Sequence, residues 1–485
     1  MKILNGSLTL SASDVSSAFS CHHRTALDLA VARKERPAPS YFDPMTAALQ
    51  QRGLEHEKRY VDSLRARGLS VVELASFGGE QAVAATIEAM KTGVQAIVQA
   101  SLQRGPWNGR ADVLLRVERE SALGPWAYEP VDTKLGRETR AASILQLALY
   151  AKLACDHLGA LPERFCVVTP AEEPGTYREQ WQRVDDFHAY FRFVRDALAS
   201  ATAQPTTTLL DTTYPEPVAH CDVCRWWESC DKRRRADDHL SLVAGITRLQ
   251  RRELSERGVQ TLAQLSEAPL PAKLKRGSVE SFERVRKQAR MQWLTRAQQQ
   301  PLFELLPIDP VQGLCTLPLP SLGDVFLDIE GNPFAESGGR EYLFGLVSLG
   351  DDGTTSYQGF WATTAAEERK AFETLMDLLQ ERWMQHPGMH VYHYAPYEPS
   401  ALKRLMSRHA TREEGLDKLL RGGRFVDLYR VIKNALIAGV ERYSIKDLEI
   451  FYGFKRQVEL RTASRMLRTV EHALELSAFD SLQPE

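Results

Sequence analysis

The spacing of hydrophobic and polar residues changes several times along the chain, and each change predicts a new element. A helical pattern that includes Cys21 runs to about Arg33, and the Pro-containing stretch Arg36–Pro44 ends it. A second helical pattern then continues through Arg67. We therefore predict two helical segments at the N-terminus, separated by a loop.

The next part of the chain combines strand and helix patterns. Residues alternate between polar and apolar in the β-rich segments Arg110–Val117 and Trp126–Lys134. Apolar residues return at helical spacing from Glu138 to His157, and Arg164–Val168 has the composition of another strand. The order strand, strand, helix, strand predicts an α/β core.

The second half of the chain predicts two further segments. Leu242–Leu265 indicates two short helices around Gly258, a pattern that resembles a helix-hairpin-helix but also fits helices that only pack together. A Gln- and Pro-rich linker at Gln298–Pro320 leads into a new α/β unit that opens with the strand Asp324–Ile329. We therefore predict an α/β multidomain protein with segments 1–238, 239–320 and 321–485.

Length and composition agree with a soluble multidomain protein. A chain of 485 residues is too long for one hydrophobic core. It has no apolar run that could span a bilayer and no signal peptide, so we expect a cytoplasmic protein. The net charge of -2 does not exclude nucleic-acid binding, because basic residues can gather along one groove.

The seven cysteines fall into two groups. Three of them lie in apolar segments and are predicted to be inert core thiols: Cys155, Cys166 and Cys315. The other four are a far upstream cysteine and a C-x2-C-x5-C motif: Cys21, Cys221, Cys224 and Cys230. Four thiolates can hold zinc or an iron–sulfur cluster, and the spacing alone does not decide between them.

Two acids and a lysine form the first candidate site. Asp132 and Lys134 are two residues apart on a predicted strand and project to one face, beside Asp112 on the neighbouring strand. Two carboxylates suit Mg²⁺ or Mn²⁺, and a lysine can orient water and stabilise charge on a phosphate. This combination suits metal-assisted phosphodiester hydrolysis.

The neighbouring motifs strengthen this interpretation. Gly53-Leu54-Glu55-His56 lies on the earlier helix, and Gln146 and Tyr150 lie one turn apart on the later one. The ordered set G-x-x-H, D, D-x-K and Q-x-x-x-Y resembles the RecB-like branch of the PD-(D/E)XK nucleases, which have a restriction-endonuclease-like core. The resemblance implies metal binding by His56, Asp112 and Asp132, catalysis by Lys134, and support or DNA contact by Gln146 and Tyr150.

The cysteine layout extends the resemblance. One cysteine before the nuclease core and three after it are similar to the iron–sulfur nucleases of this group, including CRISPR-adaptation nucleases. The resemblance implies that the four cysteines bind a [4Fe–4S] cluster that ties the two ends of the domain together. We expect Trp226 and Trp227 to pack over the cluster.

A second pair of acids, Asp328 and Glu330, ends the strand of the last segment. Two carboxylates on one strand face suit a two-metal site, although acidic pairs are also frequent in turns. With Glu398 after a second strand, the order resembles the DnaQ-like, RNase H-fold exonucleases, whose usual residue at that position is Asp. Asp427 matches a position that is usually not catalytic.

Compared with the DnaQ-like family, the second segment lacks the last motif. Tyr443 and Asp447 resemble the helix before the last motif of that family, and no Y-N-x-x-D motif lies between Lys455 and Glu485. The chain is either a fragment of a protein that continues, as relatives do, into a superfamily 1 helicase, or this segment is a degenerate binding or scaffold module.

The leading hypothesis is therefore a Mg²⁺- or Mn²⁺-dependent DNA nuclease that acts on single strands or ends in repair, recombination or defence. Two alternatives remain. One is a nucleic-acid-binding module that does not cleave, and the other is a zinc-stabilised scaffold for a partner helicase.

Overall fold

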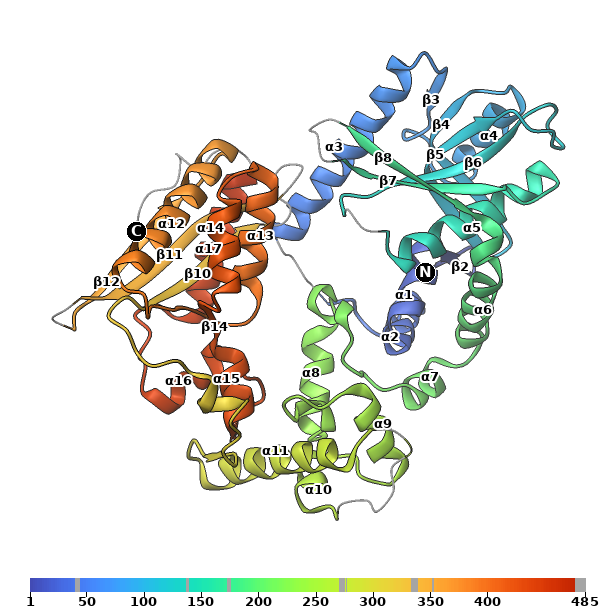
Figure 1. The fold of residues 1–485 in the computed structure, drawn as a ribbon. Helices are drawn as coiled ribbons and strands as arrows, with labels where there is room; N and C mark the ends of the chain where they lie inside the picture. Colours follow the sequence, from blue (N-terminus) through green and yellow to red (C-terminus); the bar gives the residue numbers. More distant parts are fainter. Residues whose placement is uncertain are drawn as a thin grey trace. The chain divides into compact units, whose positions relative to one another are not determined.

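Two large sheets organise the described residues, one in each unit, and a third sheet of two strands lies in the second unit. The computed structural model describes residues 1–39, 44–136, 139–171, 176–269, 275, 277–332, 339–350 and 353–475. Residue contacts divide the chain into the units Met1–Arg233 and Arg234–Glu485 (Figure 1). Among the helices of these ranges, none is both long enough and apolar enough to cross a bilayer.

The first unit alternates strands and helices. Its elements are β1 (Lys2–Leu4), β2 (Ser7–Ser11), α1 (Ala12–Ser20), α2 (His22–Ala32), α3 (Pro44–Ala66), β3 (Val71–Glu73), α4 (Gly79–Lys91), β4 (Ala96–Arg104), β5 (Trp107–Val117), β6 (Ala127–Thr133), α5 (Ala141–Leu158), β7 (Arg164–Pro170), β8 (Tyr177–Arg183), α6 (Val184–Ala203), α7 (Thr206–Thr212), the 3-10 helix η1 (Ala219–Val223) and α8 (Trp227–Ala236), which crosses into the second unit.

Its sheet has the strand order β1-β2-β5-β6-β7-β8, and β4 pairs with both β3 and β5. Strands β4, β5 and β6 are antiparallel neighbours, whereas β7 is parallel to β6. A parallel pair needs a crossover connection, and α5 supplies it. Leu114 packs in the core with α5, and its neighbours Val113 and Leu115 pack with Tyr60 and Leu64 of α3. The two helices therefore cover opposite faces of the sheet.

The sequence predicted the centre of this unit correctly. The three expected strands are β5, β6 and β7, and the helix between the last two is α5. Strand β4 was not predicted, and neither were β1 and β2 at the N-terminus. The first predicted helical segment is two helices, because Cys21 is extended (φ -161°, ψ 113°) and starts α2 as its N-cap.

The second unit contains a helical segment followed by a mixed sheet. Its elements after α8 are the 3-10 helix η2 (Leu240–Leu242), α9 (Arg248–Glu256), α10 (Leu262–Glu267), α11 (Val279–Gln298), β9 (Phe303–Leu305), the 3-10 helix η3 (Gly313–Thr316), β10 (Val325–Asn332), β11 (Arg340–Leu349), β12 (Thr355–Trp361), α12 (Ala365–Gln385), β13 (Val391–His393), α13 (Tyr397–His409), α14 (Glu413–Arg421), β14 (Phe425–Asp427), α15 (Leu428–Ala435), β15 (Leu436–Ala438), α16 (Ile445–Tyr452) and α17 (Leu460–Glu475).

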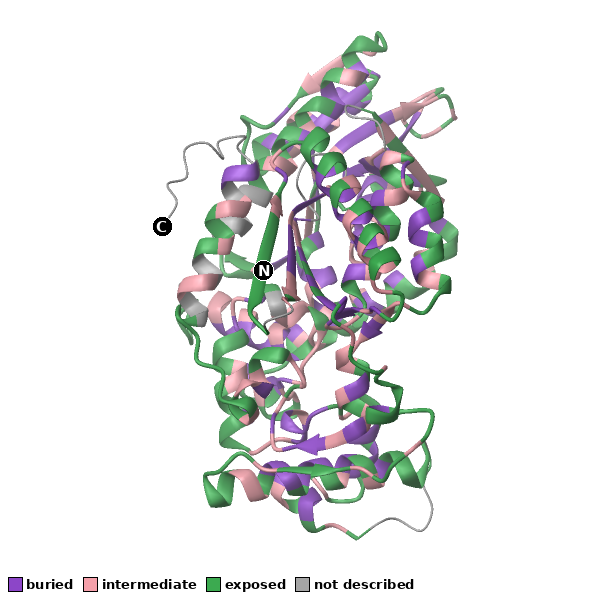
Figure 2. Ribbon diagram, turned by 60° about the vertical axis from the view of Figure 1, so that its left-hand side comes forward, coloured by how far each residue is buried: buried purple, intermediate pink, exposed green. Residues whose placement is uncertain are grey.

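The mixed sheet has the order β12-β11-β10-β13-β14. Strands β10, β11 and β12 are antiparallel, and β10, β13 and β14 are parallel. Apolar residues of β10 and β11 pack against α12, α13 and α14 on one face. Figure 2 shows that buried residues gather on strands and on the inner sides of helices. The two short helices predicted around Gly258 are α9 and α10.

Candidate active site

Neighbouring strands of the first unit bring Asp112, Asp132 and Lys134 together. Asp112 lies on β5, and Asp132 lies near the end of the antiparallel strand β6. The backbone N–H and the hydroxyl of Thr133 donate hydrogen bonds to Oδ2 of Asp112, at 2.7 and 2.9 Å. Lys134 Nζ lies 2.5 Å from Oδ2 of Asp132. The two acids and the lysine therefore share one site, as the sequence predicted; we call it the Asp112 site.

Burial and neighbouring charges set the protonation of this group. Burial raises the pKa of Asp132 to about 7, Lys134 opposes the rise, and the carboxylate of Asp112 adds to it. Burial disfavours the charged form of Lys134, but Asp132 and Asp112 outweigh that effect and raise the pKa of the lysine. Lys134 is therefore an ammonium group at neutral pH.

Helix α3 brings His56 to the same site. Its imidazole is buried, and burial lowers its pKa, with a smaller raising effect from Asp112. A neutral imidazole keeps a lone pair that can bind a metal ion. Glu57, which the sequence analysis did not single out, is also close: burial and then Asp112 raise its pKa, and Lys134 lowers it.

Gln99 on β4 fixes the position of Glu57. Its side-chain amide donates a hydrogen bond to Glu57 Oε1. The ladder register places Gln99 opposite Asp112, between the pairs Val98↔Val113 and Ala100↔Ala111. Its φ of 55° lies in the left-handed region that residues other than glycine rarely adopt. Such backbone strain persists only where surrounding structure holds it, and functional sites are common places for it.

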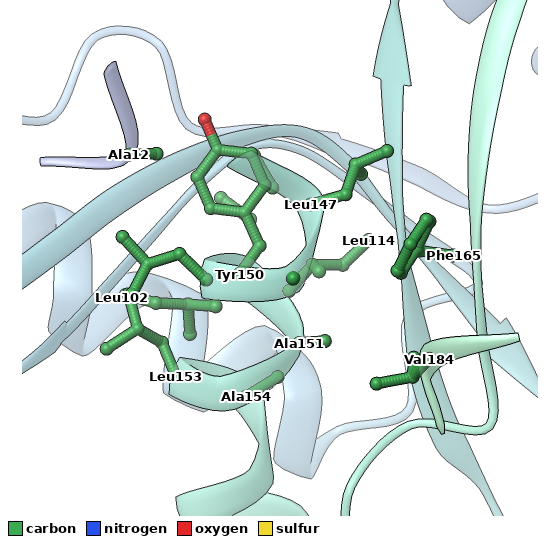
Figure 3. Packing of buried hydrophobic residues seen from close by; sticks show 14 of the residues in the cluster. Ala12, Leu102, Leu114, Leu147, Tyr150, Ala151, Leu153, Ala154, Phe165 and Val184 are labelled. Carbon is green, nitrogen blue, oxygen red and sulfur yellow. The ribbon is translucent and has the colours of Figure 1, made fainter. Parts of the chain in front are cut away.

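Helix α5 carries the last two predicted residues. Tyr150 is buried in the core, and Figure 3 shows its ring with Leu102, Leu147 and Leu153. Burial raises the pKa of Tyr150, and the carboxylates of Asp132 and Asp112 contribute. Gln146 instead donates a hydrogen bond to Ser16 of α1 at 3.4 Å. Tyr150 therefore lies near the acids, whereas Gln146 links α5 to α1.

Two buried atoms of the Asp112 site have the character of metal ligands. His56 Nε2 and Asp132 Oδ2 have no hydrogen-bond partner within the described part of the chain. The ion pair of Asp132 with Lys134 therefore does not satisfy Oδ2 as an aligned hydrogen bond would. No group of three or more His, Cys, Asp or Glu side chains among the described residues is arranged around a common metal position. The donor types fit a hard divalent cation, although the described side chains are not arranged around one common position.

Cys21 and Cys221 lie near Cys224, but the described residues do not arrange the four cysteines around a common metal position. All seven cysteines are free thiols. Cys21 Sγ accepts a hydrogen bond from the backbone N–H of Arg24, and Cys221 Sγ accepts one from Val218, both at 3.4 Å. Burial raises the pKa of Cys224, and the nearby thiols Cys221 and Cys21 contribute to the rise. Cys230 packs against the small core that contains Cys224.

One expectation about these tryptophans and cysteines was wrong, and it concerns Cys315 in the second unit. Trp226 is buried beside Cys224, and its indole N–H donates to Asp28 at 2.8 Å, whereas the side chain of Trp227 is 47% exposed. Cys315, predicted to be a core thiol, lies exposed in η3. Its apolar sequence neighbours are largely exposed too, so local composition misled the prediction.

A second acidic site lies on the mixed sheet, and we call it the Asp328 site. Asp328 and Glu330 lie on one face of β10, and the buried Glu398 lies in the first turn of α13. Burial and then Glu398 raise the pKa of Asp328, and burial and then Asp328 raise that of Glu330. Glu398 Oε2 lies 3.5 Å from His393 Nδ1, yet it has no aligned hydrogen-bond partner among the described residues.

Three other residues clarify this site. Asp427 Oδ1 accepts hydrogen bonds from the N–H groups of Tyr429 and Arg430 and caps α15, a structural role. Two charged residues that sequence reasoning missed lie near Glu330: Glu471 of α17 raises its pKa, after the larger effects of burial and Asp328, and Lys446 of α16 lowers it. Glu471 lies in no motif, and Lys446 lies in the segment with Tyr443 and Asp447, which was interpreted only as a helix before the last motif.

Comparison with known families assigns both units. A PD-(D/E)XK nuclease superfamily model matches residues 20–231. The first unit carries a PD-(D/E)XK nuclease domain. An RNase H superfamily model matches residues 325–469, so the second unit carries an RNase H-like domain. No protein in the curated set matches the chain.

These matches confirm the predicted fold class of the two domains. Both superfamilies consist of nucleases, which are hydrolases that bind nucleic acids. The PD-(D/E)XK nucleases generally use divalent metal ions such as Mg²⁺ or Mn²⁺. The Asp112 site lies in the nuclease domain, and the Asp328 site lies in the RNase H-like domain.

The contact between Gly109 and Tyr150 yields a stability prediction. A Cβ atom at Gly109 would lie 2.7 Å from Cδ1 and Cε1 of the Tyr150 ring, which packs in the core. Gly109→Ala should therefore lower the free energy of unfolding by about 1–3 kcal/mol through overpacking. Urea unfolding measures this change. Gly53→Ala is the control, because nothing lies within 4 Å of its added Cβ; equal stability of both variants would contradict the prediction.

Proposed function

We propose that the chain is a Mg²⁺- or Mn²⁺-dependent DNA nuclease that hydrolyses phosphodiester bonds at the Asp112 site, on single strands or DNA ends. The observation that carries the proposal is the convergence of Asp112, Asp132 and Lys134 in a domain of a nuclease superfamily. Two acids beside a lysine provide both metal ligands and a fixed positive charge, which phosphodiester hydrolysis requires.

The roles follow from the chemistry of each group. His56, Asp112 and Asp132 would hold the divalent ion, which supplies an activated water and neutralises charge on the phosphate. Lys134 remains protonated beside Asp132 and can donate to the phosphate oxygens as negative charge develops. Tyr150 supports the strand that carries Asp112 by packing against Gly109, and Gln146 anchors α5 to α1.

We further propose that Cys21, Cys221, Cys224 and Cys230 hold a [4Fe–4S] cluster with a structural role. Free thiols, backbone N–H bonds to two of the sulfurs, and the proximity of Cys21 and Cys221 to Cys224 support it. When bound, the cluster would supply a crosslink between segments about 200 residues apart, which restricts the unfolded chain. Zinc is the alternative occupant of four thiolates.

The RNase H-like domain has a separate role in this proposal. Asp328, Glu330 and Glu398 are its candidate metal ligands, and their mutual effects on pKa support a shared site. A superfamily 1 helicase, in the same chain or as a partner, would supply single strands to the nuclease domain. Repair, recombination and defence against foreign DNA all need such end processing.

Degradation of end-labelled single-stranded DNA tests the nuclease proposal. We expect cleavage with Mg²⁺ or Mn²⁺ and none after chelation, because the carboxylates need a cation to bring a phosphate close. Asp112→Asn should abolish cleavage, and Asp62→Asn, which changes an exposed acid of α3, should not.

Binding of the labelled strand without degradation under either ion would contradict the proposal and favour a non-cleaving binding or scaffold module. Undiminished cleavage by Asp112→Asn would show that the reaction occurs at another site.

A further inference from the structure

The face of the mixed sheet that carries Asp328 and Glu330 has a second, aromatic character. In antiparallel strands, directly opposed residues share a face. The registers align three rows across β10, β11 and β12. These rows are Phe326–Val347–Tyr357, Asp328–Gly345–Gly359 and Glu330–Leu343–Trp361. Each row therefore begins at β10 and ends on the edge strand β12.

The aromatic rings of these rows are unusually exposed for a sheet. Phe326, Tyr357 and Trp361 expose 42%, 63% and 50% of their surface. The opposite face of β10 and β11, with Val325, Leu327 and Phe344, is buried under α12, α13 and α14. The aromatic face is thus a surface of the RNase H-like domain, and it borders the Asp328 site directly.

Two glycines shape this surface. A Cβ at Gly345 would lie 3.3 Å from the Tyr357 ring, and one at Gly359 would lie 3.0 Å from its hydroxyl. The Tyr357 ring therefore lies across both glycines and reaches the row of Asp328. A ring that lies flat over two glycines presents its other π-face to solvent. Because the ring is already held in place, little side-chain conformational entropy is lost when a base stacks on it. Exposed rings on a sheet are a common means of stacking unpaired bases.

We propose that Phe326, Tyr357 and Trp361 form a base-stacking platform that holds a single-stranded nucleic acid beside Asp328 and Glu330. The inference rests on nucleic-acid binding by the RNase H-like domain and does not require cleavage at the Asp112 site. A strand stacked along β12 would bring its backbone to the two carboxylates. Lys446, exposed on α16 and near both acids, adds a positive charge for phosphate.

Photo-crosslinking of the full chain locates the strand. The probe is a short oligo(dT) with 4-thiothymidine, bound with Mg²⁺ to the full-length Asp112→Asn variant, so that the carboxylates have a cation and the nuclease site does not cleave. We expect crosslinked peptides from β10 and β12 that contain Phe326, Tyr357 or Trp361. Crosslinks only in the nuclease domain would overturn the platform and leave the proposed nuclease function intact.

Affinity measurements test the stacking itself. Tyr357→Ala combined with Trp361→Ala should remove the β10 and β12 crosslinks and weaken binding of oligo(dT) at this domain by about 10- to 100-fold. Tyr357→Phe with Trp361→Phe should restore both, because the rings remain. Phe303→Ala, which removes an equally exposed ring from β9, is the matched control.

Three further outcomes would refute the platform. Unchanged crosslinks in the double alanine variant would exclude stacking, and equal affinity for duplex and single strands would exclude recognition of unpaired bases. Dissociation of a dimer by the same variant, seen in light scattering, would assign the aromatic face to self-association.

Discussion

Lys134→Ala should reduce phosphodiester cleavage by about 10²- to 10⁴-fold while the fold is retained. The Nζ atom of this side chain lies 2.5 Å from Oδ2 of Asp132. Its loss removes the stabilisation of negative charge on the phosphate. It also raises the pKa of Asp132 further, since Lys134 is the group that lowers it. Single-turnover cleavage of labelled single-stranded DNA measures the effect.

Two comparisons make this result specific. Lys91→Ala removes an exposed lysine at the end of α4 and should leave the cleavage rate unchanged. Lys134→Arg keeps the positive charge but replaces the ammonium group by a planar guanidinium group, so we expect a cleavage rate between those of the wild type and Lys134→Ala. If Lys134→Ala cleaves at the wild-type rate with a normal unfolding midpoint, Lys134 does not stabilise the reacting phosphate.

Cys21→Ser should remove the iron and sulfide of anaerobically purified protein and, with them, its visible absorbance. Cys21 is the one proposed ligand from the N-terminal side of the domain, so the crosslink to Cys221 depends on it. By analogy with crosslinks that close long loops, the free energy of unfolding should fall by about 2–5 kcal/mol. Metal analysis and urea unfolding of the full chain give the two readouts.

The control for this prediction is Cys315→Ser, because that thiol is exposed and lies in the other unit. It should keep both the iron content and the stability. Wild-type protein that contains zinc and no iron would contradict the iron–sulfur proposal and would indicate that the four cysteines hold a structural zinc ion. Full iron content in Cys21→Ser would exclude Cys21 as a ligand.

The motifs of the two families could be found in the sequence, whereas some of the elements around the sites could not. The order of His56, Asp112, Asp132-x-Lys134 and Gln146-x-x-x-Tyr150 was readable because these residues lie in regular elements or directly after one. Asp132 lies near the end of β6 and Lys134 directly follows the strand, so the two-residue spacing of an extended chain places the two side chains together. The N-terminal strands β1 and β2 were not readable, since short strands at the edge of a sheet carry too few residues for a pattern.

Pairs that lie far apart in sequence could not be predicted in the same way. Glu57 enters the Asp112 site through a hydrogen bond from Gln99, 42 residues away, and Gln99 adopts a left-handed backbone that no local motif indicates. The approach of Glu471 to Glu330 likewise depends on how α17 packs. Local propensity contains no information about such contacts, because they depend on which elements become neighbours.

The sequence by itself determined the two domain folds and predicted the candidate acids of each site, because strand alternation and motif order are local properties. The tertiary structure alone decided which groups share those sites, which cysteines lie near Cys224, and which aromatic rings remain exposed. Sheet register is the physical reason: it aligned Tyr357 and Trp361 with Phe326 and Glu330 across three strands, and burial on the opposite face left those rings on the surface.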